Sequence, residues 1–295
     1  MMSEAIPAVD GGAGSSAPIG IFDSGVGGLS VLRHIHALLP HESLLYFADT
    51  AFSPYGDKTE AAVAARSLAI GAFLVARGAK ALVVACNTAT VAAIARLRVA
   101  YPHLPIVGVE PGLKPGAAAS RNGKVAVMAT DGTLAGAKFQ LLHQQLSQSS
   151  QATFLLRGCT GLADQIELGQ LDSTELTAML RRYILPLLEQ GADTLVLGCT
   201  HYPLVRTAIE AIVAEAGASH VVLVDTGDAV ARQLGRLLAA GNLLAPASLP
   251  ADHVAVRGYT SASADKLRAA FSALVGLDVA VEAVTLEAAP AALAG

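Results

Sequence analysis

Two cysteines stand at matching places in the two halves of the chain, and their thiols could serve as a pair of proton donors and acceptors. Cys86 and Cys199 each follow a short aliphatic run that is typical of a buried parallel strand. A glycine precedes each of them by the same interval, at Gly78 and Gly191. The thiolate is the working form of such a base, and neighbouring groups can bring the thiol pKa toward neutrality. The repeated pattern therefore predicts a reaction with two faces.

Polar residues directly follow both thiols and favour a chemical role over a structural one. Asn87 and Thr88 follow the first cysteine, and Thr200 and His201 follow the second. A lone cysteine is more often a small buried side chain, and its neighbours are then mostly aliphatic. The third cysteine, Cys159, lacks the strand-end pattern, so we expect it to be a buried thiol.

The elements that must position these residues predict an α/β fold. The expected strands of the first half, which alternate with three helices, are 19–22, 43–48, 81–84 and 106–109. A strand over 124–128 and a small polar loop then restart the pattern, with Thr130 in the place of Ser24. Ligands of such sheets bind beyond the carboxyl ends of the strands. The repeat predicts two pseudosymmetric α/β domains with mainly parallel sheets and the active site in the cleft between them.

The domain boundaries are expected where the composition changes. Prolines and glycines between Pro111 and Gly116 indicate a crossing between domains. We expect a first domain over 18–112 plus 226–288 and a second domain over 113–225. Residues 1–17 are rich in Gly, Ala and Ser and lack the basic start and apolar core of a signal peptide. We expect them to form a disordered extension.

A glycine-rich turn from Asp23 to Gly28 joins the first strand to the first helix. Backbone N–H groups at such a helix start favour an anion, and glycines let a ligand approach the main chain. Ser30 stands where a dinucleotide fingerprint requires its third glycine, so a ligand carboxylate fits this turn as well as a phosphate. Asp23 itself has two open roles, as a helix N-cap and as a functional carboxylate. A second polar loop over 49–56 also lies on the ligand side.

Composition favours small-molecule chemistry in a reducing compartment. The chain of 295 residues has a net charge of -4, only 4% aromatic residues and no tryptophan, which argues against a nucleic-acid partner. Charged residues interrupt its richest apolar region, so no membrane span is expected. Three cysteines without a signal peptide suit the cytoplasm better than a disulfide framework.

Five motifs are spread over nearly the whole chain after residue 17. They are Phe22-Asp-Ser-Gly-Val-Gly-Gly-Leu-Ser30, Tyr46-Phe-Ala-Asp-Thr50 with Pro54-Tyr-Gly56, Ala85-Cys-Asn-Thr-Ala89, Gly108-Val-Glu-Pro111 and Leu197-Gly-Cys-Thr-His-Tyr-Pro-Leu204. In order and spacing they resemble the glutamate racemases of the aspartate/glutamate racemase family. The resemblance implies interconversion of L- and D-glutamate for the bacterial cell wall, with no cofactor and no metal, and a possible homodimer.

The resemblance also implies roles for individual residues. Cys86 and Cys199 would be the two acid/base thiols, with Asp23 assisting the first, and Glu167 and His201 assisting the second. The implied substrate-binding residues, with Thr130 added from the internal repeat, are Asp23, Ser24, Tyr55, Gly56, Asn87, Thr88, Thr130, Thr200 and His201. The family commonly has Cys-Pro where this chain has Cys159-Thr160, and the position of Glu167 depends on that anchor. No residue carries over an activator site or the gyrase binding of some members.

The chemistry of the residues agrees with this interpretation. Inverting an amino-acid centre without a cofactor requires a base on each face of the α-carbon. Carbanion character requires donors around the substrate carboxylate, which the glycine-rich turn and the Asn, Thr and Ser side chains could provide. No lysine stands in a motif typical of a pyridoxal phosphate enzyme.

Three alternatives stay open. An aspartate or hydantoin racemase would also have paired cysteines. A nucleotide-binding module would explain the glycine-rich turn, although it leaves the two thiols without a role. A zinc hydrolase built on Cys199 and His201 lacks further ligands at a suitable spacing.

Overall fold

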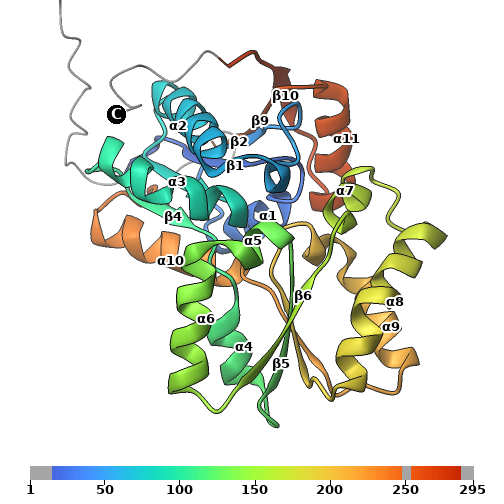
Figure 1. Cartoon of the computed structure of the whole chain (residues 1–295). Coiled ribbons are helices and arrows are strands. Elements are labelled where there is room, and N and C mark those ends of the chain that lie inside the picture. The colour runs from blue at the N-terminus through green and yellow to red at the C-terminus, as the bar shows by residue number, and fades with distance from the viewer. Residues whose placement is uncertain (1–14, 248–253, 287–295) are drawn as a thin grey trace, which may run out of the picture.

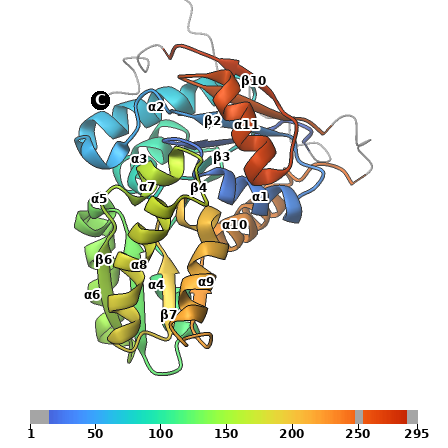
Figure 2. The same ribbon diagram turned by 90° about the vertical axis from the view of Figure 1, so that its right-hand side faces the viewer.

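The computed structural model describes residues 15–247 and 254–286, which form two lobes, each built around one parallel sheet (Figures 1 and 2). The first lobe holds a six-stranded sheet and the second a four-stranded sheet. In the part of the chain that the structure describes, no helix is long and apolar enough to span a membrane. The predicted α/β class with mainly parallel sheets is confirmed.

The sheet of the first lobe has the order β10-β9-β2-β1-β3-β4, and its neighbours all pair in parallel. Its strands are β1 (Ile19–Asp23), β2 (Leu44–Ala48), β3 (Ala81–Val84), β4 (Ile106–Gly108), β9 (Val256–Thr260) and β10 (Ala280–Ala283). Helices cover both faces, so β1, β2 and β3 are buried throughout and almost entirely apolar. One face packs against α1 (Leu29–Leu38), α10 (Gly227–Ala240) and α11 (Ala264–Val275), and the other against α2 (Glu60–Ala76) and α3 (Asn87–Ala100).

The sheet of the second lobe has the order β6-β5-β7-β8. Its strands are β5 (Lys124–Ala129), β6 (Thr153–Gly158), β7 (Thr194–Leu197) and β8 (Val222–Val224). One face packs against α4 (Leu113–Ala119) and α6 (Ala137–Ser149), and the other against α7 (Leu162–Glu167), α8 (Thr174–Glu189) and α9 (Arg206–Glu215). Short helical turns at the carboxyl ends of the two sheets are η1 (Tyr55–Asp57), α5 (Asp131–Ala135) and η2 (Tyr202–Val205).

The internal repeat appears in the topology. The run β2-β1-β3-β4 of the first lobe has the same relative order as β6-β5-β7-β8 of the second. The cysteines follow the equivalent strands β3 and β7, each beside the first strand of its lobe. The turns that enter these strands contain Gly78 and Gly191, with φ of +82° and +84°, a backbone conformation that favours glycine. The repeated glycine-to-cysteine spacing is therefore one turn-strand unit used twice.

The chain passes between the lobes after β4 and again after β8. We propose domain boundaries at 112/113 and 225/226, because α10 packs in the core of the first lobe and α4 in the core of the second. Most of the extension expected over 1–17, through residue 14, lies outside the described residues, as do 287 and 288.

Helix α4 occupies a segment that we expected to be only a crossing. Pro115 falls in its first turn, where backbone N–H groups have no partner within the helix. Gly116 lets the helix lie close on β7, because a Cβ atom there would stand 2.5 Å from Val196 Cγ2. Tertiary packing therefore outweighs the weak helix propensity of both residues.

Candidate active site

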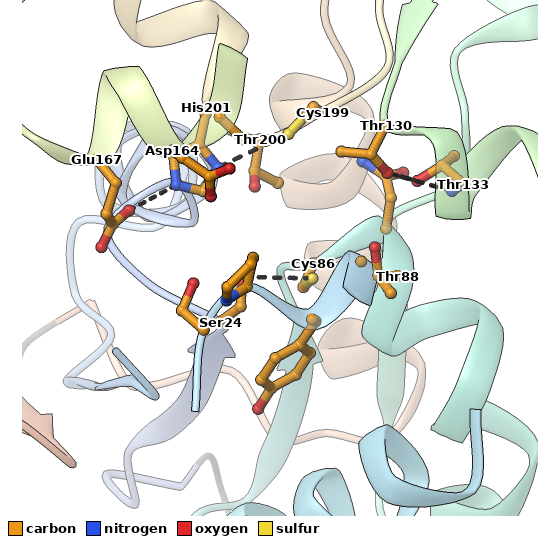
Figure 3. A pocket seen from close by; sticks show the side chains of 16 residues that line it. Ser24, Cys86, Thr88, Thr130, Thr133, Asp164, Glu167, Cys199, Thr200 and His201 are labelled. Carbon is orange, nitrogen blue, oxygen red and sulfur yellow. Dashed lines mark hydrogen bonds and ion pairs between the residues drawn. The ribbon is translucent and has the colours of Figure 1, made fainter. Parts of the chain in front are cut away.

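A pocket lies between the lobes, at the carboxyl ends of both sheets, and both cysteines line it (Figure 3). It encloses about 460 Å³ of space, part of which is open to solvent. The residues that line it are Ser24, Ser53, Pro54, Tyr55, Gly56, Cys86, Asn87, Thr88, Thr130, Thr133, Ala163, Asp164, Glu167, Cys199, Thr200 and His201. The two lobes contribute a thiol each, and Figure 3 shows Cys86 and Cys199 on opposite sides of the space.

The site residues expected from the sequence come together at this pocket. All of them line it except Asp23, which lies fully buried next to Ser24. Five further lining residues were not predicted from the sequence, namely Ser53, Pro54, Thr133, Ala163 and Asp164. Helical spacing could have indicated two of them, because Thr133 follows Thr130 and Glu167 follows Asp164 by three positions.

Cys86 is held at the N-terminus of α3. Its Sγ atom accepts the N–H of Ala89 at 3.5 Å, and its thiol donates to Ser24 Oγ at 3.9 Å. Ser24 Oγ in turn donates to Asp23 Oδ1 at 3.3 Å. Burial raises the pKa of the Cys86 thiol well above its ordinary value, and the Asp23 carboxylate adds to this rise. In the free site Cys86 is therefore a neutral thiol that can give a proton.

Cys199 has a different partner. His201 Nδ1 lies 3.7 Å from its Sγ atom, and His201 Nε2 lies 2.6 Å from Glu167 Oε2. Burial alone would lower the pKa of His201, but its hydrogen bonds to Cys199 and Glu167 raise that pKa well above the ordinary value. For Glu167 the effects are opposite: burial alone would raise its pKa, but the hydrogen bond to His201 keeps that pKa below its ordinary value. The raised pKa favours the protonated form of His201, which places positive charge 3.7 Å from Cys199 Sγ.

The glycine-rich turn binds carboxylates of the protein itself. Ser24 N donates to Asp23 Oδ1 at 2.7 Å, and Gly28 N donates to Asp23 Oδ2. Val26 N lies 3.1 Å from both carboxylate oxygens of Glu167, which belongs to the second lobe. The expectation that these N–H groups bind a ligand anion is therefore wrong for Ser24, Val26 and Gly28. The turn has the anion preference that we expected, and protein side chains satisfy it.

The glycines of this turn make room for the second lobe. A Cβ atom on Gly25 would stand 2.4 Å from Glu167 Oε1, and one on Gly27 would stand 2.4 Å from His201 Nδ1. Any larger residue would push the Glu167–His201 pair away from the first lobe. These glycines therefore allow the second lobe, rather than a nucleotide, to lie close to the main chain of the turn.

Asp23 connects the two lobes through hydrogen bonds to its carboxylate. Its Oδ2 atom accepts the N–H of Gly28 and, at 3.2 Å, the hydroxyl of Thr200 in the second lobe. The N-cap residue of α1 is Gly28, so Asp23 holds the turn before the helix rather than capping it directly. Burial raises the pKa of Asp23, against the lowering effect of His201. A buried carboxyl near Cys86 and Ser24 suits the assisting role that the resemblance implies.

We expect Asp23→Asn to lower turnover per folded molecule by about 10²-fold, the usual scale for loss of a group that assists proton transfer. The NH₂ group of the new amide would face Ser24 N–H or Gly28 N–H, so that two donors meet and one hydrogen bond is lost. The free energy of unfolding should therefore also fall by about 1–3 kcal/mol. Turnover and thermal unfolding of the same preparation separate the two effects. If unfolding temperature drops while turnover per folded molecule holds, Asp23 serves only the turn.

Among residues 15–247 and 254–286, no group of three or more His, Cys, Asp and Glu side chains is placed to hold a metal ion. Cys199 and His201, the two ligands that the zinc hydrolase alternative requires, contact each other through His201 Nδ1. The other ring nitrogen of His201 contacts Glu167. Cys159 is buried as expected, and burial raises the pKa of its thiol to about 12. The expectation that it does not follow a strand is wrong, because β6 ends at Gly158.

Comparison with known proteins agrees with this geometry. A family model described as Asp/Glu/Hydantoin racemase matches residues 19–234. The glutamate racemase of Pseudomonas paraeruginosa is 50% identical over 255 residues, which cover 86% of this chain and 92% of that protein. The glutamate racemase of Cupriavidus pinatubonensis is 49% identical over 276 residues, covering 93% of this chain and 97% of that protein.

Solved structures show the same architecture. Glutamate racemase isoform RacE1 from Bacillus anthracis aligns with a TM-score of 0.80 at 31% identity, covering 92% of this chain and 98% of that one. Escherichia coli glutamate racemase, solved with L-glutamate and the activator UDP-MurNAc-Ala, aligns with a TM-score of 0.79 at 32% identity, covering 92% and 100%. Sequence, fold and paired thiols agree, and the chain therefore belongs to the Asp/Glu/hydantoin racemase family of isomerases.

Proposed function

We propose that this enzyme interconverts L- and D-glutamate without a cofactor, with Cys86 and Cys199 as its two acid/base groups. The observation that carries the proposal is the arrangement of the thiols, which follow equivalent strands of two lobes and line one pocket. A carbon atom held between them can lose a proton on one face and gain one on the other. The similar proteins named as glutamate racemases support glutamate as the substrate.

The two directions use the thiols in opposite protonation states. For L-glutamate, the Cys199 thiolate, paired with the His201 imidazolium, takes the α-proton, and the Cys86 thiol donates a proton to the opposite face. The product is D-glutamate, and Cys86 is left as a thiolate. For D-glutamate the roles reverse. The thiols must then exchange protons before the next turnover in the same direction.

The lining of the pocket suits an amino acid with a second carboxylate. Among its described residues it has no lysine or arginine, and its neutral donors are Ser24, Ser53, Asn87, Thr88, Thr130, Thr133 and Thr200. Such groups can hold carboxylates by hydrogen bonds and stabilise the charge that develops as the α-proton leaves. The carboxylates of Asp164 and Glu167 suit the substrate ammonium.

Two of the alternatives differ in what they predict. An aspartate or hydantoin racemase would fit the same family model. The relative turnover of glutamate, aspartate and hydantoins therefore distinguishes the three activities. A nucleotide-binding module receives less support, because the N–H groups of the glycine-rich turn donate to Asp23 and Glu167.

We expect the purified protein to racemise L-glutamate with no cofactor added. The loss of optical rotation measures the reaction. Aspartate and hydantoins serve as competing substrates, and prolonged chelation should leave the rate unchanged. Loss of activity that zinc restores would support the hydrolase alternative, and faster turnover of aspartate would reassign the substrate.

We further propose that the D-glutamate supplies peptidoglycan synthesis. The gene should then restore growth of a bacterial strain that requires added D-glutamate. A Cys199→Ser variant in the same strain is the control, because it keeps the fold and lacks one of the two thiols.

A further inference from the structure

One wall of the pocket comes from the loop over 49–57, between β2 and α2. Ser53, Pro54, Tyr55 and Gly56 of this loop all line the pocket. The same loop touches the second lobe, since a Cβ atom on Gly132 of α5 would stand 3.3 Å from Gly56 O. The position of this loop therefore sets both the shape of the pocket and one contact between the lobes.

The loop is anchored at its first residue by an ion pair between a buried carboxylate and a partly exposed arginine. Asp49 is fully buried, and its carboxylate accepts Arg66 Nε at 2.7 Å and Arg66 Nη2 at 2.6 Å. Arg66 lies on α2, beyond the end of the loop, so the pair closes the loop at its base. Asp49 N also donates to Asp23 O at 3.0 Å. A two-pronged arginine–carboxylate pair with this geometry is among the strongest and most directional polar contacts in proteins.

The anchor extends to the pocket wall through Tyr55. Its hydroxyl donates to Asp49 Oδ2 at 2.8 Å, so this group is committed inside the protein. Burial, with the nearby Asp49 carboxylate, raises the pKa of Tyr55 well above its ordinary value, which keeps the hydroxyl a donor. The ring of Phe52 packs edge-on against Tyr55, with centroids 5.8 Å apart, and the Arg66 guanidinium lies 5.5 Å from the Phe52 centroid.

We propose that Asp49 and Arg66 are positioning residues for substrate binding, which act through the Tyr55 hydroxyl to hold Tyr55 and Gly56 in the pocket wall. The proposal rests on the proposed function for its kinetic part. Neither residue lines the pocket, so their effect on substrate must pass through the loop.

The test compares Arg66→Met with a matched variant, Lys80→Met. Lys80 forms a buried ion pair with Glu42 in the same lobe, before β3 and so at the amino end of the sheet. Both changes leave a buried carboxylate without its cation, and both should lower the unfolding temperature. Only Arg66→Met should raise KM for L-glutamate, by about tenfold to a hundredfold, as for loss of a charge-assisted hydrogen bond. Its kcat should stay within about threefold, because the loop that the ion pair holds only positions bound substrate and no proton moves through the ion pair.

Two further variants keep the test decisive. Arg66→Lys keeps the charge but not the planar fork, so KM should recover only in part. Tyr55→Phe combined with Arg66→Met should raise KM less than the product of the two single effects, because both changes break one network. An unchanged KM in Arg66→Met, or fully multiplicative effects in the double variant, would overturn the proposal.

Amide hydrogen exchange in the absence of substrate separates this inference from the choice of substrate. Exchange over residues 50–58 should be faster in Arg66→Met than in the wild-type chain and should be unchanged in Lys80→Met. Equal exchange in wild type and Arg66→Met overturns the positioning role. Faster exchange in a protein that does not racemise glutamate supports the role of Arg66 and rejects the proposed function.

Discussion

Serine in place of either Cys86 or Cys199 is expected to abolish racemisation, with a loss of at least about 10³-fold in kcat. In the proposed mechanism each thiol acts alone on its face of the α-carbon, and a serine hydroxyl is too weakly acidic to share the proton transfer. The matched control is Cys159→Ala, since Cys159 is buried outside the pocket lining and should be dispensable. Optical rotation measures the loss.

The two serine variants should differ in what they retain. Cys86→Ser keeps Cys199, the proposed base for L-glutamate, and should still exchange the α-proton of that enantiomer with deuterated water. Cys199→Ser should do the same for D-glutamate only. Proton NMR of each enantiomer follows the exchange without requiring inversion.

Isotope transfer in the wild-type enzyme tests two bases against one. In deuterated water, early product should contain deuterium while unreacted substrate stays protiated, because the proton removed by one thiol is not the one returned by the other. A single base that swings between faces would return some of the original proton. Full racemisation by either serine variant contradicts the two-thiol mechanism.

His201→Asn is expected to lower kcat/KM by about 10²–10⁴-fold, the range for loss of a group that sets the protonation state of a catalytic base. The two enantiomers are mirror images of equal free energy, so kcat/KM must fall equally in both directions. The difference between the two sides of the site should instead appear in exchange. We expect α-proton exchange from L-glutamate to slow more than exchange from D-glutamate. Equal slowing would contradict the pairing of His201 with Cys199.

Glu167→Gln tests the same pair through its pH dependence. Removing the carboxylate removes one of the two partners that raise the pKa of His201, so the imidazolium should lose its proton at lower pH. The alkaline limb of the kcat/KM profile should therefore move to lower pH. A limb that stays in place would show that another group titrates there.

The stability of the folded chain should follow the same pair. The raised pKa of His201 contributes stability that is complete below its ordinary value of 6.5 and is lost as pH rises through the folded value. The lowered pKa of Glu167 contributes stability present above its ordinary value of 4.5 and lost as pH falls through the folded value. The difference in unfolding temperature between wild type and Glu167→Gln should thus be largest between the two ordinary values, 4.5 and 6.5, and shrink on both sides.

Local patterns were sufficient to predict the strands that precede the two thiols, β3 and β7. They missed β6, an edge strand whose residues are mostly not buried. The apolar runs before Cys86 and Cys199 indicate strands that are buried on both faces. This pattern can be recognised from residues that are adjacent in the chain. The glycine-rich turn was also recognised, but its partner was not, because Glu167 lies 141 positions away from Val26. A sequence shows that a turn favours an anion and does not show which carboxylate the fold brings there.

The residues that were missed depend on tertiary contacts. Ser53 and Asp164 line the pocket only because a loop of one lobe faces a helix of the other. Arg66 reads as an ordinary charged residue of a helix, and its bond to Asp49 has no local signature. Helix α4 was missed because Pro115 and Gly116 oppose it locally while packing on β7 favours it.

The order of strands in the first lobe has a consequence for how the chain is made. The second sheet is built from β5 to β8, a continuous stretch, so it is complete once residue 224 has been synthesised. The first sheet begins with β1 but needs β9, at Val256–Thr260, to cover the edge of β2. During synthesis the earlier strands must wait with that edge exposed, while the later lobe can fold as a unit. The sheet whose first strand is translated earliest is therefore the one completed last, after β9 and β10 have been synthesised.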